Sequence, residues 1–191
     1  MIKALYRRLN HCNDLAVRIS KANTAQLQQL KAELAELIGT PTGCYTMGIP
    51  AVLSTLGVIV SFGIPQLWLG YKVSAALGLP EESLFIWVVL IALLFSGING
   101  MTMFLIGKGL MRAVQMHLTL AVISLVLTTV YLLTALSGAS VPGVSLIAAL
   151  ISIFMLLLSG YCIHSTSFYK MLLFTLHNRA WRKLLHQTRK T

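Results

Sequence analysis

Four long apolar runs divide the chain, and polar or charged residues separate them. The runs cover residues 49–70, 84–106, 117–136 and 144–163, and none of them contains Asp, Glu, Lys or Arg. A helix needs about 20 apolar residues to cross the roughly 30 Å hydrocarbon core of a bilayer. The pattern therefore predicts an all-α, polytopic membrane protein. We expect one membrane domain over residues 49–164, formed by four transmembrane helices.

The first 38 residues follow a different pattern. Apolar residues recur there at alternating spacings of three and four, first over residues 2–19 and again over residues 27–37. This spacing is typical of a helix that buries one narrow stripe. Asn23 and Gln26 resemble a capping box, which begins a new helix. We expect residues 1–38 to form a cytoplasmic hairpin of two amphipathic helices, and one long helix remains the alternative.

Leu30 and Leu34 lie on the apolar stripe of the second of these helices and are candidates for interaction with another helix. The stripe has two possible uses. The hairpin can pack on its own membrane domain or on the membrane surface, or it can form a coiled coil with a partner. Both interpretations rest on the same spacing, so the sequence leaves them open.

Two further segments flank the membrane domain. Residues 39–48 contain glycine and proline directly after the last apolar position of the hairpin, which predicts the end of a helix and a linker. Residues 165–191 place apolar residues on one side of a predicted helix and basic residues on the other. We expect this C-terminal amphipathic helix to lie on anionic lipid. Its tryptophan and leucines fit a membrane surface, so we expect no nucleic-acid partner.

Composition and charge then define the topology. The chain is 57% hydrophobic and 10% charged, whereas a soluble domain carries about 25% charged residues. It has 15 Lys and Arg residues, and four spans would place all of them except Lys72 on one side of the membrane. Positively charged loops stay on the cytoplasmic side. This asymmetry predicts that both termini are cytoplasmic, in a bacterial inner membrane, and it accounts for the net charge of +10.

The second span carries most of the candidate interaction residues. Ser96 and Gly100 are four residues apart, and Gly97 follows Ser96. Small residues at this spacing let a neighbouring transmembrane helix approach closely, so we expect this side of the helix to face protein. Asn99 is the only amide in the span. We expect it to hydrogen-bond across helices rather than to hold a ligand.

The first span combines a stripe of small residues with an internal proline. Gly57 lies in the stripe between Ser54 and Ser61, which favours close packing of helices. Pro65 has no N–H group, so it should kink the helix and free a carbonyl one turn earlier. Such kinks line binding sites in some transporters and are packing features elsewhere.

Residues that carry chemistry are scarce in the spans. Proton relays, ion-coupled antiporters and voltage sensors use charged residues within the membrane, and the four spans have none. His117, Cys162 and His164 lie near the predicted cytoplasmic ends of their spans. They lack a fourth ligand and a recognised zinc spacing. We therefore predict no catalytic residue, no metal site and no cofactor.

These observations favour a non-catalytic protein that acts through contacts with another membrane protein or with itself. We expect either an accessory subunit of a membrane complex or an immunity protein against a membrane-active toxin. The first alternative is a protomer of an oligomeric channel or transporter, with the kinked first span and Asn99 along the pathway. The second alternative is a membrane enzyme that acts on lipid through His117, Cys162 and His164.

Overall fold

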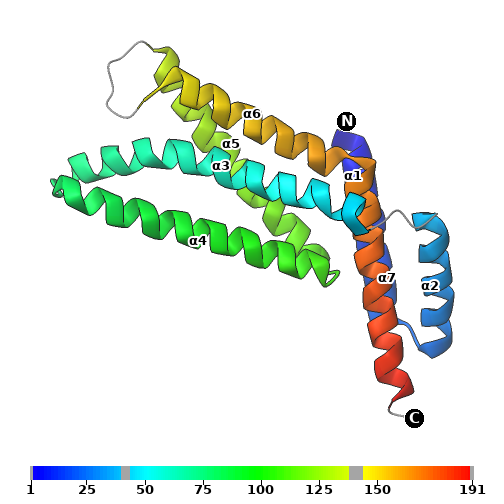
Figure 1. The fold of residues 1–191 in the computed structure, drawn as a ribbon. Helices are drawn as coiled ribbons and strands as arrows, with labels where there is room; N and C mark the ends of the chain where they lie inside the picture. Colours follow the sequence, from blue (N-terminus) through cyan, green and yellow to red (C-terminus); the bar gives the residue numbers. More distant parts are fainter. Residues whose placement is uncertain (1, 40–43, 138–143, 190–191) are drawn as a thin grey trace. The chain divides into compact units, whose positions relative to one another are not determined.

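The structure, a computed structural model, describes residues 2–39, 44–137 and 144–189, and for residues 2, 44–47, 81 and 82 it describes the backbone alone. These residues form seven helices and no strand, which confirms the all-α prediction. The helices are α1 (Ile2–Lys21), α2 (Thr24–Ile38), α3 (Cys44–Ala76), α4 (Glu81–Gly107), α5 (Met111–Leu136), α6 (Leu146–His164) and α7 (Thr166–Thr188), as Figure 1 shows.

Four of these helices are long and apolar enough to cross a membrane, as predicted. The qualifying stretches are Gly48–Ala76, Ser83–Gly107, Met111–Leu136 and Leu146–His164. The helix α3 begins at Cys44, so residues 44–48 of the predicted linker are helical. Residues 40–43 of that linker lie outside the described residues. The composition is that of a multi-pass membrane protein.

The chain divides into two compact units. The first unit consists of Met1–Val52, Thr102–Gln115 and Cys162–Thr191, and the second consists of Leu53–Met101 and Met116–Tyr161. All Lys and Arg residues except Lys72 belong to the first unit. The second unit contains most of each of the four apolar helices α3, α4, α5 and α6.

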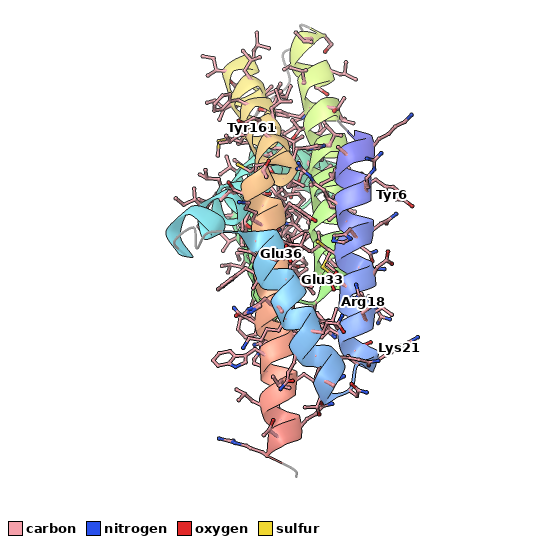
Figure 2. All side chains as sticks on the ribbon, turned by 90° about the vertical axis from the view of Figure 1, so that its right-hand side faces the viewer. Tyr6, Arg18, Lys21, Glu33, Glu36 and Tyr161 are labelled. Carbon is pink, nitrogen blue, oxygen red and sulfur yellow. The ribbon has the colours of Figure 1, made fainter. Side chains whose placement is uncertain are left out.

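In the first unit, α1 and α2 are separate helices. The chain leaves the helical conformation at Ala22 and Asn23, and Asn23 caps α2. Its side chain accepts a hydrogen bond from the Gln26 N–H, and the Gln26 side chain accepts one from the Asn23 N–H. This confirms the predicted capping box. Arg18 of α1 and Glu33 of α2 form an exposed ion pair at 3.1 Å (Figure 2), which is one contact between the two helices.

The helix α7 packs against both α2 and α1 (Figure 1). Seven of its side chains are buried: Phe168, Met171, Leu172, Leu173, Thr175, Leu176 and Ala180. The sequence analysis assigned this apolar face to lipid. The structure uses it as the core of a three-helix unit, because the stripes of α1 and α2 need an apolar surface to bury. Trp181 and Leu185, further along α7, remain half exposed.

The stripe of α2 differs by one position from the predicted one. Leu27, Leu30, Leu34 and Ile38 are buried, whereas Leu37 is 44% exposed. A straight helix turns once every 3.6 residues, so a position four residues after Leu34 stays on the packed face. Leu30 and Leu34, the two interaction candidates, are therefore used inside the chain, where α2 packs on α7.

Lysine and arginine side chains of the first unit donate to backbone carbonyls near the ends of helices. Lys183 of α7 donates to three carbonyls at and just beyond the last turn of α1, those of Ile19, Ser20 and Ala22, at 2.9, 2.8 and 3.1 Å. The last carbonyls of a helix have no partner within the helix and carry its negative dipole end. The Lys183 ammonium group gives these carbonyls hydrogen-bond donors, and its positive charge interacts favourably with the dipole. Lys183 therefore holds the end of α1 against α7.

Three arginines make similar contacts. Their partners are the carbonyls of His164 (from Arg8), Gly109 (from Arg179) and Lys108 (from Arg182), at 3.1, 3.0 and 3.1 Å. Gly109 has a φ of +78°, and a Cβ there would lie 2.9 Å from the Thr175 carbonyl oxygen. Glycine is therefore required where this loop meets α7. Part of the basic charge of the C-terminal helix thus serves packing within the chain.

Cys12 provides a reporter for this unit. Its side chain is fully buried in α1, and burial raises the pKa of its thiol from 9.0 to about 12. Because the thiolate is the reactive form, we expect iodoacetamide to modify Cys12 at least about 10³-fold more slowly in the folded protein than in urea at pH 8. Cys44 and Cys162 would be replaced by serine, and mass spectrometry would follow the reaction. Equal rates in the two states would contradict the packing of α1.

The second unit contains a three-helix core made of α3, α5 and α6. Buried residues of this core recur every seven positions: Ser54, Ser61 and Trp68 in α3, His117, Ser124 and Tyr131 in α5, and Ser152 and Ser159 in α6. A seven-residue repeat keeps one seam of each helix facing its neighbours. The helix α4 packs on α3, where the Phe62 and Phe95 rings stack with centroids 3.7 Å apart.

Candidate functional site

The polar side chains of the three-helix core form hydrogen-bonded layers. In one layer, Ser54 Oγ lies 2.8 Å from His117 Nε2 and 3.0 Å from Ser159 Oγ. The three side chains come from α3, α5 and α6, and at most 1% of each is exposed. Polar groups inside a membrane protein need such partners, because hydrocarbon offers none. The layer therefore holds the three helices together.

A second layer surrounds the carbonyl that Pro65 releases. Pro65 lies within the continuous helix α3 and cannot donate to the carbonyl of Ser61, four residues earlier. The Ser61 oxygen instead lies 2.9 Å from Thr128 Oγ1 of α5 and 2.8 Å from Ser152 Oγ of α6. The proline thus creates an acceptor that two other helices share. The released carbonyl serves helix packing.

The second layer is closed. Thr128 Oγ1 also lies 2.9 Å from Ser152 Oγ, so the two hydroxyl groups and the Ser61 carbonyl are in mutual contact. Each hydroxyl has one proton, so at most two of these three contacts are hydrogen bonds at one time. Direct contacts of this length leave no space for a solute between the three groups. They give the channel hypothesis no pathway at Pro65.

Gly57 lies where α3 and α6 approach each other. A Cβ at this position would be 2.5 Å from the Met155 carbonyl oxygen and 2.9 Å from the Cβ of Ser159. Both distances are too short for a side chain. Gly57 therefore brings the helices close enough for the layer of Ser54 and Ser159 to form.

Asn99 is fully buried on the packed face of α4, together with Phe95. Its Nδ2 donates to the Phe95 carbonyl of the same helix at 3.0 Å, rather than to another helix. Its Oδ1 has no hydrogen-bond partner among the described residues. The expected hydrogen bond across helices is therefore not among the contacts that the structure describes.

The small residues of α4 lie on a different face from Asn99. Gly97 and Gly100 are exposed, and Ser96 is partly exposed. A Cβ built at either glycine would have no atom of the chain within 4 Å. The exposed face continues along the helix through Ile86, Leu90 and Leu93, which are 60%, 47% and 65% exposed. The face that small residues open for a close neighbour thus has no neighbour within the described chain.

The sequence grouped His117 with Cys162 and His164, whereas the structure pairs His117 with Ser54. A serine beside a histidine is the arrangement of a nucleophile and its base. Ser54 and His117 are 0% and 1% exposed, which leaves no access for a substrate. Among the described residues, no group of three His, Cys, Asp or Glu side chains is placed to hold a metal ion.

The sequence analysis missed Gln66. This amide lies within the first span, is 4% exposed and donates from Nε2 to the Val88 carbonyl of α4 at 2.6 Å. A systematic count of amides in the spans would have found it beside Asn99. Its position at the junction of α3 and α4 depends on packing, which the sequence alone does not reveal.

Comparisons of the chain with models of protein families, with curated protein sequences and with solved structures found no match.

Proposed function

We propose that this chain is a non-catalytic protein of the bacterial inner membrane that acts through contact with another membrane protein. Its role would be that of an accessory subunit of a membrane complex or of an immunity protein against a membrane-active toxin. The observation that carries this proposal is the exposed face of α4 around Gly97 and Gly100, where a Cβ added at either glycine would have no atom of the described chain within 4 Å.

The exposed face of α4 around Gly97 and Gly100 would allow a second helix to approach closely. Association of helices in lipid depends on van der Waals packing and on hydrogen bonds, because lipid is as apolar as leucine. Glycine lets two backbones meet, and larger side chains on either side of it supply contact area. On α4 the larger residues Leu93 and Leu90 precede the glycines on the same exposed face. We propose that a helix of the partner packs here.

Charge supports the orientation that goes with this proposal. The first unit carries every Lys and Arg except Lys72, and it includes α1, α2 and α7. Positive residues accumulate on the cytoplasmic side of inner-membrane proteins. We propose that this unit faces the cytoplasm, with both termini. The partner would then meet α4 in the bilayer while the three-helix unit stays accessible from the cytoplasm.

Leucine substitutions at the glycines test the proposal. A leucine at Gly97 or Gly100 meets no atom of the chain itself at its Cβ, so the fold should be unchanged. Against a partner helix it would force the backbones apart, and we expect the amount of co-purifying partner to fall by at least about tenfold, equivalent to about 1.4 kcal/mol. Tagged variants would be extracted gently from native membranes and the bound proteins quantified by mass spectrometry.

Gly63 provides the matched control. A Cβ at Gly63, on α3, would also have no atom within 4 Å, so Gly63→Leu adds the same bulk at a site outside the proposed interface. This variant should keep the partner. Loss of the partner in all three variants, or retention in all three, would rule out the α4 face as the interface.

A further inference from the structure

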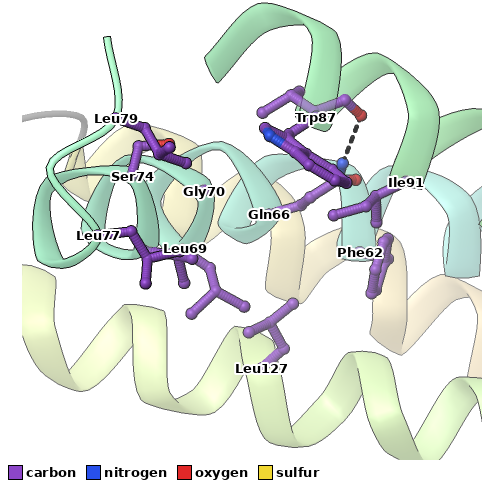
Figure 3. Close-up of a pocket in the computed structure, with 12 residues that line it drawn as sticks. Phe62, Gln66, Leu69, Gly70, Ser74, Leu77, Leu79, Trp87, Ile91 and Leu127 are labelled. Atoms are coloured by element: carbon purple, nitrogen blue, oxygen red, sulfur yellow. Dashed lines mark hydrogen bonds between the residues drawn. The ribbon is translucent and has the colours of Figure 1, made fainter. Parts of the chain in front are cut away.

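A cavity of ≈ 290 Å³ lies between the second half of α3 and the first half of α4, with one residue of α5 on its border. Figure 3 shows Gln66, Trp87 and Ile91 gathered at one end and Leu69 and Leu77 toward the other. The residues that line it carry no charge. The volume is about twice that of an engineered apolar cavity of about 150 Å³ that binds benzene. The cavity is thus large enough for a small apolar molecule.

Gln66 contributes a buried acceptor to this cavity. Its Nε2 lies 2.6 Å from the Val88 carbonyl oxygen, shown by the dashed line in Figure 3. A carbonyl accepts hydrogen bonds, so the group that faces it must be the N–H of the amide. The Oε1 atom is then fixed as the remaining acceptor. It is buried and has no hydrogen-bond partner among the described residues.

Buried acceptors without a partner are rare, because water or another donor normally satisfies them. The Ser74 hydroxyl and the Trp87 N–H also line the cavity, but neither these nor any other donor of the described residues is hydrogen-bonded to Gln66 Oε1. The missing partner must therefore be a donor, and it must reach the acceptor through a space with apolar walls. A charged group would find no counter-charge among the lining residues.

We propose that this cavity binds an uncharged, membrane-soluble alcohol. Its hydroxyl donates to Gln66 Oε1, and its apolar body lies against Leu69, Val73, Trp87 and Ile91. The ligand class is thus a lipid or lipid-like molecule with one hydroxyl on a hydrocarbon body. Trp87 and Val73 are 54% and 47% exposed, which leaves the cavity open to the surrounding lipid. This site is separate from the glycine face of α4.

Trp87 allows a direct test, because bromine quenches tryptophan fluorescence on contact. The purified full-length protein in lipid nanodiscs would be titrated with bromoundecanol and with bromoundecane, which lacks the hydroxyl. We expect saturable quenching that Trp87→Phe removes, with an affinity about tenfold higher for the alcohol, as one added hydrogen bond gives. Quenching that rises linearly without saturation would show simple partitioning and overturn the proposal.

Two variants identify the site. Gln66→Met keeps the length of the side chain and removes the acceptor, so both compounds should bind equally and as weakly as bromoundecane binds to the wild type. Val73→Phe fills the cavity from its wall, so saturable quenching should disappear for both. An alcohol preference that persists in Gln66→Met, or saturable binding that persists in Val73→Phe, would overturn the proposal. The second variant decides the question if the first does not fold.

Discussion

Replacing Thr128 by valine and Ser152 by alanine together is expected to lower the free energy of unfolding of the second unit by about 2–3 kcal/mol. Both hydroxyls reach the Ser61 carbonyl, which Pro65 deprives of its usual helical partner. With both removed, a buried carbonyl has no donor, and such a group costs about 1–3 kcal/mol. Unfolding in a mixed-micelle denaturant titration would measure the change.

Adding Pro65→Ala to this double variant should recover part of the loss. Alanine restores an N–H at position 65, and this group can donate to the Ser61 carbonyl within α3. In the wild-type background the same carbonyl already has its two donors, so Pro65→Ala should have little effect there. The prediction is thus a coupling of about 1–2 kcal/mol between Pro65 and the two hydroxyls.

Thr129→Val is the matched control for the loss of a hydroxyl. Thr129 is exposed on the same helix, and its hydroxyl donates to the Leu125 carbonyl of its own turn at 2.8 Å. Its removal breaks no contact between helices, so a change under about 0.5 kcal/mol is expected. If Thr128→Val with Ser152→Ala cost no more than this control, or if Pro65→Ala gave no recovery, the shared carbonyl would not stabilise the core.

The second large effect is expected for Lys183→Met. Methionine keeps the apolar stem and removes the ammonium group that donates to the Ile19, Ser20 and Ala22 carbonyls. Hydrogen bonds to a charged group contribute about 1.5–3 kcal/mol, and partial exposure of the site reduces this. We expect α1 to separate from α7 more easily by about 2 kcal/mol, which corresponds to about 30-fold faster modification of Cys12.

Cys12 reports this opening because it lies beside α7. Burial raises the pKa of Tyr169 on α7, the neighbouring Cys12 adds to the rise, and Arg8 opposes it. Lys170→Met is the control, since Lys170 lies on α7 but donates to none of the three carbonyls. Its effect on the modification rate should be less than about threefold. A Lys183→Met rate equal to that of the control would show that the lysine does not hold α1.

Local patterns predicted much of the fold. The apolar runs placed four long helices, because spanning length and lack of charge are properties of a segment alone. Asn23 and Gln26 marked the start of α2, since a capping box involves only neighbouring residues. Pro65 indicated a released carbonyl for a similar reason, although the sequence did not identify its partners. The seven-residue repeat in α3, α5 and α6 was present in the sequence but was not used.

For α4 and α7, the sequence did not determine which surroundings the packed face would have. The helix α4 is apolar around its circumference, so its hydrophobic pattern has no direction. The structure places Phe95 and Asn99 inward and leaves Gly97 and Gly100 exposed. The apolar face of the C-terminal helix α7 could be covered equally well by lipid or by protein. In the structure the apolar stripes of α1 and α2 cover it, and this depends on packing between helices. Gln66 gained its role through contact with Val88, 22 residues away.

The most direct test of the proposed function is the composition and molar mass of the complex that the wild-type protein forms in its native membranes. Gentle extraction, mass spectrometry and light scattering would give both. The proposal predicts a second membrane protein in fixed stoichiometry with this chain. A closed assembly of this chain alone would favour an oligomeric channel instead. A monomer without any bound protein would contradict a function through protein–protein contact.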